Sequence, residues 1–331
     1  MKNRIVGGTL AAIGIVLAVS VYLWPQLIAE IPIRLAPAIA ALEPAPRVLF
    51  VGDIMLDRVV AMHANAVGDE QLFAGVRGLF GDANAVVGNL EGTITSMPSV
   101  SQASTTILRF TFAPRMADVL RAAGMSAVSV ANNHAYDFGV SGYEETLANL
   151  ERAGIAAFGS PLNDKNISTT LLVYGRKICL IGYMQLYDPN MKSVLDTLAA
   201  IRPSCDRLVV FAHWGVEYQH EPTDAQREAA HALVDAGVDV VIGAHPHVVE
   251  PVEIYHNRAI FYSLGNFIFD QGWKPEVRRG LSVLIEFGTG ETTFKLTPVF
   301  TYEGASVADA ATTAAVLSDA GVSSPTFVLK N

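Results

Sequence analysis

The chain has 331 residues, 51% of them hydrophobic, and a formal net charge of -9. This length is enough for one or two domains with a large core. The negative charge disfavours nucleic acid as a partner, and it repels an anionic substrate at long range. A phosphate or polyanion ligand would therefore need local positive charge, supplied by a metal ion or by clustered basic residues.

The N-terminus has the pattern of a membrane anchor. Lys2 and Arg4 precede residues 5–24, a run of 20 residues without a charge. At about 1.5 Å of rise per residue, a helix of this length matches the hydrocarbon thickness of a bilayer. The positive-inside rule keeps residues 1–4 in the cytoplasm. We therefore predict a single-pass protein of the cell membrane whose remaining chain is extracytoplasmic.

The boundaries after the apolar run are predicted from composition. A cleaved signal peptide stays open as the alternative to an anchor, because Ala38-Ile39-Ala40 resembles a cleavage site, although it lies well beyond the run. Residues 25–46 are rich in alanine and proline, which disfavours a long helix and predicts a linker. A globular domain is predicted over 47–300. The weakly patterned residues 301–331 are predicted to be a tail, either one helix or a loose segment.

Short apolar runs alternate with helical patterns in the first part of the domain. The runs are RVLFVGD, AVVGN, AVSVANNH, LVVFAHWG and VDVVIGAHPH. Continuous apolar runs suit strands buried on both faces, as in a parallel sheet covered by helices. Three predicted helices end in an Ala-Gly pair, at Gly124, Gly154 and Gly237, where glycine can adopt the left-handed helix-ending conformation. Repeated strand–helix units of this kind predict an α/β fold.

The C-terminal part of the domain has a different pattern. Residues 253–262, 281–287 and 292–297 are predicted to be strands joined by short turns, which favours antiparallel pairing. The two cysteines, Cys179 and Cys205, are too few for a disulfide framework or a cysteine-based zinc site. We favour two buried thiols, and a single disulfide in an oxidising compartment stays open.

Polar side chains follow five apolar runs, at the point where each predicted strand ends. They are Asp53, Asn89, Glu91, Asn133, His134, His213, His245 and His247. Ligands of open α/β sheets bind at the carboxyl ends of strands, and neighbouring strands lie about 5 Å apart, so these side chains can converge. Carboxylate, amide and imidazole groups suit Zn, Mn or Fe. A single strand-terminal Asp is more often a helix cap; recurrence at five strands predicts a metal centre.

Six segments of the chain have the form of known motifs. They are FVGDIMLDR at 50–58, VGNLEGTIT at 87–95, VANNHAYDFG at 130–139, FAHWGVEY at 211–218, GAHPHVVEPVE at 243–253 and YSLGNFIFD at 262–270. In this order they resemble the capsule-synthesis CapA (PgsA-like) family of the calcineurin-like metallophosphoesterases. The resemblance covers about residues 47–290. It implies a sandwich of two packed mixed sheets flanked by helices, and a part in making or exporting poly-γ-glutamate.

The resemblance also implies a role for each residue of the predicted centre. Asp53 and His247 match ligands of a first metal, and Asn89 stands where metallophosphoesterases keep a bridging Asp, with Glu91 two residues on. Asn133, His213 and His245 match ligands of a second metal. His134 matches the general acid or phosphate-facing histidine, which makes it the candidate catalytic residue.

Two departures from the metallophosphoesterase pattern weaken the first metal site. The pattern begins Asp-x-His, and here Met55 stands in place of the histidine. Methionine is a poor ligand for a hard or borderline ion. The bridging Asp is replaced by the neutral Asn89, a loss of charge that Glu91 can restore. We therefore expect one tightly held divalent ion, or two unequal ones.

Three functions remain open at this point. The first is an extracytoplasmic metal-dependent hydrolase or transferase acting on an anionic polymer or a phosphoester. The second is a non-catalytic, metal-stabilised subunit of a polyglutamate synthesis or export complex with other membrane subunits. The third is a phosphoesterase of small molecules that is only tethered to the membrane. Met55 and Asn89 favour the second function, whereas His134 favours the first.

Overall fold

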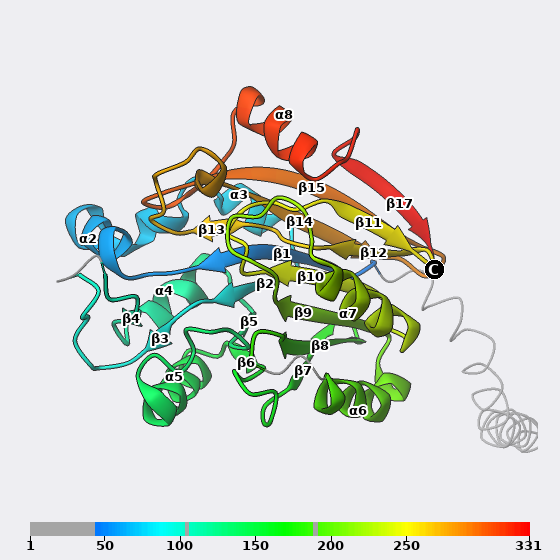
Figure 1. Ribbon diagram of the computed structural model, residues 1–331, viewed down its shortest axis with the longest axis horizontal. Coiled ribbons are helices and arrows are strands. Elements are labelled where there is room, and N and C mark those ends of the chain that lie inside the picture. The colour runs from blue at the N-terminus through cyan, green and yellow to red at the C-terminus, as the bar shows by residue number, and fades with distance from the viewer. Residues whose placement is uncertain (1–43, 103–105, 188–190) are drawn as a thin grey trace, which may run out of the picture. The chain divides into compact units, whose positions relative to one another are not determined.

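The computed structural model describes residues 44–102, 106–187 and 191–331 (Figure 1). The predicted membrane helix over 5–24 and residues 25–43 of the predicted linker lie outside the described residues. Within the described ranges, none of the helices combines the length and the apolar character that a membrane crossing requires.

Two mixed sheets form the centre of the domain. The first has the strand order β16-β15-β14-β1-β2-β5-β6, with β13 also paired to β1 and β17 to β15. Its strands are β1 (Arg47–Ile54), β2 (Ala85–Leu90), β5 (Ala127–Ser129), β6 (Ala156–Phe158), β13 (Asn266–Ile268), β14 (Arg279–Phe287), β15 (Glu291–Thr301), β16 (Ala305–Val307) and β17 (Thr326–Lys330). β1, β2, β5 and β6 run parallel, whereas β14 is antiparallel to β1 and β15.

The second sheet has the order β11-β12-β10-β9-β8-β7. Its strands are β7 (Ser168–Val173), β8 (Arg176–Met184), β9 (Arg207–His213), β10 (Val240–Ala244), β11 (Val252–Tyr255) and β12 (Arg258–Phe261). β8, β9, β10 and β12 are parallel, and antiparallel β7 and β11 close the two edges. A separate pair of short strands consists of β3 (Thr93–Ile94) and β4 (Thr111–Phe112).

The helices follow the strands as the sequence pattern predicts. They are α2 (Arg58–Val67), α3 (Arg77–Gly81), α4 (Met116–Ala123), α5 (Gly139–Arg152), α6 (Lys192–Ile201), α7 (Asp224–Asp235) and α8 (Ala310–Asp319), with short 3-10 turns η1 (Asp69–Phe73), η2 (Arg202–Ser204) and η3 (Glu276–Arg278). Thr223 and Gln226 form a reciprocal capping box at the start of α7. Gly124, Gly154 and Gly237 all have positive φ angles, which confirms the predicted helix ends.

Alternate residues of the strands define the layers. Val48 and Phe50 of β1 pack with Val209 of β9, in a core between the two sheets. Their neighbours Leu49 and Val51 pack on the opposite face, in the cluster that contains Leu120 of α4. The far face of the second sheet packs against α6 and α7. The fold is therefore mixed α/β, with two stacked sheets flanked by helices, as predicted.

The residues after 300 do not form a separate tail. β16 and β17 both pair with β15, and α8 lies along the same strand (Figure 1). Val316 and Ala320 join the core between the sheets. Residues 45–331 accordingly form one compact unit, and the predicted boundary at residue 300 has no structural counterpart.

Cys179 of β8 and Cys205 after η2 form a disulfide, with their Cα atoms 5.8 Å apart. The preference for two free thiols was therefore wrong, and the open alternative is confirmed. The sequence could not decide between them, because the approach of the two cysteines depends on how α6 and η2 return the chain to β8.

Removing the disulfide is expected to lower the free energy of unfolding by about 3 kcal/mol, because the bond closes a loop in the unfolded chain. The two cysteines are separated by 26 residues in sequence. Urea unfolding of the full chain and of a Cys179→Ala/Cys205→Ala variant measures the loss. A reducing agent should lower the midpoint of the parent and leave the variant unchanged; equal midpoints for both proteins would contradict the prediction.

Candidate metal centre

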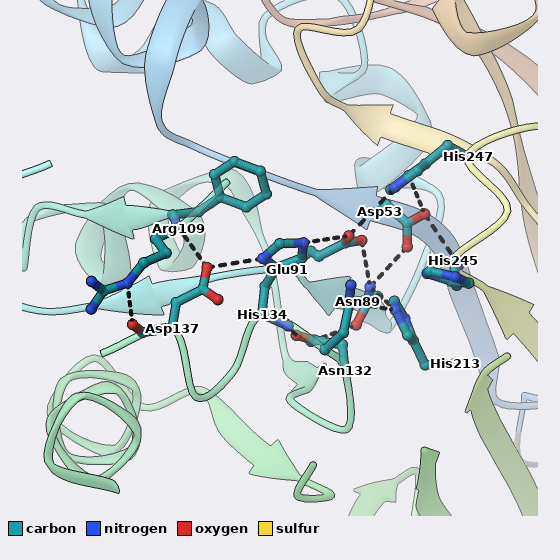
Figure 2. A network of polar contacts seen from close by, with 12 residues as sticks. Asp53, Asn89, Glu91, Arg109, Asn132, His134, Asp137, His213, His245 and His247 are labelled. Atoms are coloured by element: carbon teal, nitrogen blue, oxygen red, sulfur yellow. Dashed lines mark hydrogen bonds and ion pairs between the residues drawn. The ribbon is translucent and has the colours of Figure 1, made fainter. Parts of the chain in front are cut away.

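The two sheets bring the predicted polar residues together at one edge (Figure 2). In the first sheet Asp53 is in register with both Asn89 and Asn266. In the second sheet His213, the last residue of β9, lies opposite Ala244, after which β10 ends. The two sheets face one another, so their carboxyl ends place these side chains around one volume. The prediction that the strand ends converge is thus supported by the register.

The turn after β10 aims both of its histidines at this volume. His245 has a φ angle of 98° and His247 one of 60°, a region that residues other than glycine seldom adopt. The strand has ended by then, so the two imidazoles are not forced to opposite faces. The backbone N–H of His245 donates to Oδ2 of Asp53, 3.4 Å away. Strained backbone of this kind is typical of functional sites.

Asn89 lies at the centre of the first group of ligands. Its Nδ2 is 2.8 Å from Oδ1 of Asp53, 3.2 Å from Oε2 of Glu91 and 3.4 Å from Nδ1 of His213. Its Oδ1 accepts from Nδ2 of Asn132 at 2.9 Å. Asn132 was missed by the sequence interpretation, although it stands beside two residues that were chosen. Its role is to orient the amide of Asn89.

Asn133 and His247 are also held by named partners. Oδ1 of Asn133 is 2.8 Å from Nε2 of His213. Nδ1 of His247 is 3.0 Å from Oδ1 of Asn266 and 3.2 Å from Oδ2 of Asp53, and its Nε2 is 3.6 Å from Oε1 of Glu91. These contacts orient the imidazole rings of His213 and His247.

The geometry supplies two groups of three possible metal ligands. One consists of Asp53, Glu91 and His213, all buried, and the other of Glu217, His245 and His247; within each group the ligand atoms lie within 4.8 Å of one another. Glu217 is exposed and was not predicted, because it follows β9 by four residues, in an irregular loop rather than at a strand end. The local sequence Trp214-Gly215-Val216-Glu217 does not by itself indicate a metal ligand.

Two buried atoms of the cluster lack a hydrogen-bond partner. They are Oε1 of Glu91 and Nδ1 of His245. A buried polar atom without a partner is costly, and each of the two belongs to a residue of one ligand group, where a cation would be a partner. The residues present therefore fit a bound divalent ion, both in the type of their donor atoms and in having buried donor atoms without a hydrogen-bond partner.

The electrostatics of the cluster lead to the same conclusion. Burial, with the nearby His245 and His247, lowers the pKa of His213 well below its ordinary value. Burial and His247 lower the pKa of His245 to about 4. Both imidazoles are therefore neutral near pH 7, the form that binds metals. Burial and the carboxylate of Asp53 raise the pKa of Glu91 well above its usual range, so this side chain gains from a neighbouring cation.

His134 lies at the rim of the cluster, between two carboxylates (Figure 2). Its Nδ1 is 2.9 Å from Oδ2 of Asp137, and its Nε2 faces Oε1 of Glu91 at 4.0 Å. Asp137 is itself fixed by the backbone N–H of Phe110, 2.6 Å from Oδ2. A proton on Nδ1, donated to Asp137, leaves Nε2 directed towards the ligand cluster. Asp137 is a second residue that the sequence interpretation missed.

Met55 does not contribute to the centre. Its side chain is fully buried in the core between the first sheet and its helices, and its Sδ lies 3.1 Å from the backbone N of Asp57. Asp57 caps α2 and accepts from Ser99 and Gln102. The departure at residue 55 therefore removes a ligand, and Glu217 offers a carboxylate from another loop.

Most of the domain matches a known protein family. Residues 47–271 match the family model described as bacterial capsule synthesis protein PGA_cap. The chain belongs to this family. All eight residues predicted for the centre lie within the part of the PGA_cap chain that the family model matches. The predicted membership of the capsule-synthesis family is thus confirmed.

Individual relatives of this PGA_cap protein agree with the family match. The chain is 35% identical to the PGA biosynthesis protein CapA of Bacillus subtilis, over 77% of this chain and 71% of the relative. It is 29% identical to the capsule biosynthesis protein CapA of Bacillus anthracis, over 67% of this chain and 59% of the relative. A solved structure of a Staphylococcus aureus protein assigned as a 5'-nucleotidase is 14% identical, with a TM-score of 0.45 over 72% of this chain and 51% of that one.

Proposed function

We propose that this protein is a membrane-anchored, extracytoplasmic component of poly-γ-glutamate capsule synthesis or export whose metal centre carries out hydrolysis or group transfer on the polymer. We also assign it to the calcineurin-like metallophosphoesterases. The observation that carries the proposal is the buried cluster in which Glu91 and His245 each keep one ligand atom unpartnered, beside His134. Such a cluster is built to hold a cation next to a proton donor.

Two features support the extracytoplasmic location. The uncharged run over 5–24, preceded by Lys2 and Arg4, has the length and charge bias of an anchor whose following chain is outside. The disulfide between Cys179 and Cys205 is of the kind that persists in oxidising compartments and is rare in the cytosol.

The chemistry follows from the residues that face the cluster. A divalent ion held by Asp53, Glu91 and His213, or by Glu217, His245 and His247, would act as a Lewis acid towards an anionic substrate. Manganese, zinc and iron suit this donor set, as one ion or two. Nε2 of His134, oriented through Asp137, can deliver a proton to a leaving group. Asn89 and Asn132 keep the carboxylates apart and in place.

Metal analysis of the purified full chain, with turnover assays on poly-γ-glutamate and on a phosphodiester, tests the proposal. We expect at least one equivalent of a divalent metal and metal-dependent turnover of the polymer. His245→Ala should lose both, whereas His231→Ala, a half-buried histidine of α7 that pairs with Glu253 and belongs to neither ligand group, should lose neither. A chain that binds no metal under conditions that do not strip it would overturn the centre.

A non-catalytic subunit of a synthesis or export complex is the second candidate. The neutral Asn89 and the methionine at position 55 favour it, because the first removes a bridging charge and the second removes a ligand that a two-ion site needs. Bound metal without turnover of either substrate, together with a lower melting temperature after metal removal, would support this function instead. Turnover of the phosphodiester alone would favour a tethered phosphoesterase of small molecules.

A further inference from the structure

A second concave feature lies next to the metal centre, outside the part of the chain that the family model matches. It is a pocket of about 230 Å³, lined by Gly272, Trp273, Lys274, Pro275, Arg278, Arg279, Phe300 and Thr312. Three of these side chains are basic and none is acidic. The lining is therefore positively charged, although the chain as a whole has a net charge of -9.

The basic groups of this pocket are only partly paired with acidic groups. The guanidinium of Arg278 lies over the rings of Phe300 and Tyr302, at 5.0 and 4.8 Å, and Nε of Arg278 is buried without an acceptor. Across the described residues, neither Arg278 nor Lys274 has a carboxylate partner. Arg279 pairs with Asp319 through one nitrogen, and its Nε also lacks an acceptor. Stacked arginine with a free edge is suited to carboxylates.

The pocket and the metal centre share a wall. Trp273 contacts Tyr218 edge to face, with ring centroids 5.2 Å apart, and Tyr218 stacks on His247 at 6.0 Å. Nδ2 of Asn266 donates to the backbone carbonyl of Val277, in η3, while its Oδ1 holds His247. A ligand that extends from the metal centre past Tyr218 and Trp273 would reach the basic pocket.

Two arginines lie nearer the centre. Arg58, over the ring of Phe110, is paired with the carboxylate of Asp270. Arg109 donates from Nε to the backbone carbonyl of Asp137, on the side of His134 (Figure 2). On the opposite side, past Tyr218, the basic groups that can attract an anionic chain are Lys274 and Arg278.

We propose that this pocket is a subsite for an anionic polymer, binding carboxylates of one stretch of the chain while a neighbouring stretch lies at the metal centre. The subsite rests on the proposed function for the nature of the polymer, but it is independent of what the metal centre does. The subsite would let a negatively charged protein hold a negatively charged polymer. Trp273 lies between the pocket and the metal centre.

Binding of fluorescently labelled poly-γ-glutamate to the purified full chain tests the subsite. We expect Lys274→Gln/Arg278→Gln to weaken binding about tenfold or more at low salt, and less at physiological salt, because screening shortens the reach of the charges. The matched control is Arg121→Gln/Lys177→Gln, which removes two exposed charges elsewhere and should bind as the parent does. Lys274→Gln alone, which disturbs no ring contact, should weaken binding in the same direction.

The readouts separate the subsite from the proposed function. Metal content should not change in Lys274→Gln/Arg278→Gln, because neither residue belongs to the ligand cluster. Unchanged polymer affinity in this variant, or no polymer binding by the parent, would overturn the subsite whatever the metal content. Binding of anionic phospholipid vesicles through Lys274 and Arg278, without binding of the polymer, would also overturn it and would assign the pocket to the membrane surface.

Discussion

Replacing His134 by asparagine is expected to lower the turnover of the metal-loaded protein by about 10²- to 10⁴-fold, the usual contribution of a positioned proton donor. The side chain of asparagine fills part of the same space but cannot give up a proton near neutral pH. Metal content should be unchanged, since Nε2 of His134 is 4.0 Å from Oε1 of Glu91 and the ligands are held by other residues. Single-turnover rates and metal analysis on the same preparation measure both quantities.

His63 offers a matched control for this substitution. It lies on α2, away from the cluster, and pairs with Glu303. His63→Asn should have the turnover of the parent. If His134→Asn were as active as His63→Asn, His134 would have no part in proton transfer.

Asp137→Asn separates positioning from proton transfer. The carboxylate of Asp137, 2.9 Å from Nδ1 of His134, fixes which nitrogen faces the cluster. Its loss should therefore reduce the single-turnover rate while the metal content stays that of the parent. Metal content that falls together with the rate would assign Asp137 to the folding of the centre instead.

The centre could be predicted from the sequence because its ligands are tied to strand ends. Asp53, Asn89 and His213 each end or nearly end an apolar run, and parallel pairing brings such positions to one edge. Glu217 could not be found in this way. It reaches His245 and His247 from a loop whose course depends on the backbone contact between Tyr218 and Pro246, a contact between segments distant in sequence.

The C-terminal residues show a second limit of sequence patterns. β17 alternates between exposed and half-buried positions, so its composition differs little from that of a loop. It becomes a strand because β16 covers only Val299–Thr301 of the outer edge of β15, so that Glu291–Lys295 can pair with β17. Pairing of this kind is decided by the partner strand, which explains why a tail was predicted from 301 onwards.

Glu250→Gln is expected to stabilise the protein in alkaline solution and to leave it unchanged in acid. Glu250 is 1% exposed; its Oε2 accepts from Nε2 of Gln226 at 2.8 Å, and its Oε1 has no partner. Burial is the main cause that raises the pKa of Glu250 to about 8, from an ordinary value of 4.5. The folded protein therefore keeps a proton that the unfolded chain releases. The free energy of unfolding should fall as the pH rises from 4.5 through 8, by roughly 5 kcal/mol in total.

Glutamine at position 250 can still accept from Gln226 and carries no charge, so this part of the pH dependence should disappear. Thermal and urea unfolding of parent and variant between about pH 5 and pH 9 measures it. Glu228→Gln, at an exposed position of α7, is the matched control and should keep the slope of the parent. Glu250 is also connected to the candidate centre. Its partner Gln226 belongs to the capping box of α7, and the side chain of Gln226 lies against Gly215, at the start of the loop that carries Glu217. Parallel slopes for all three proteins would contradict the raised pKa of Glu250.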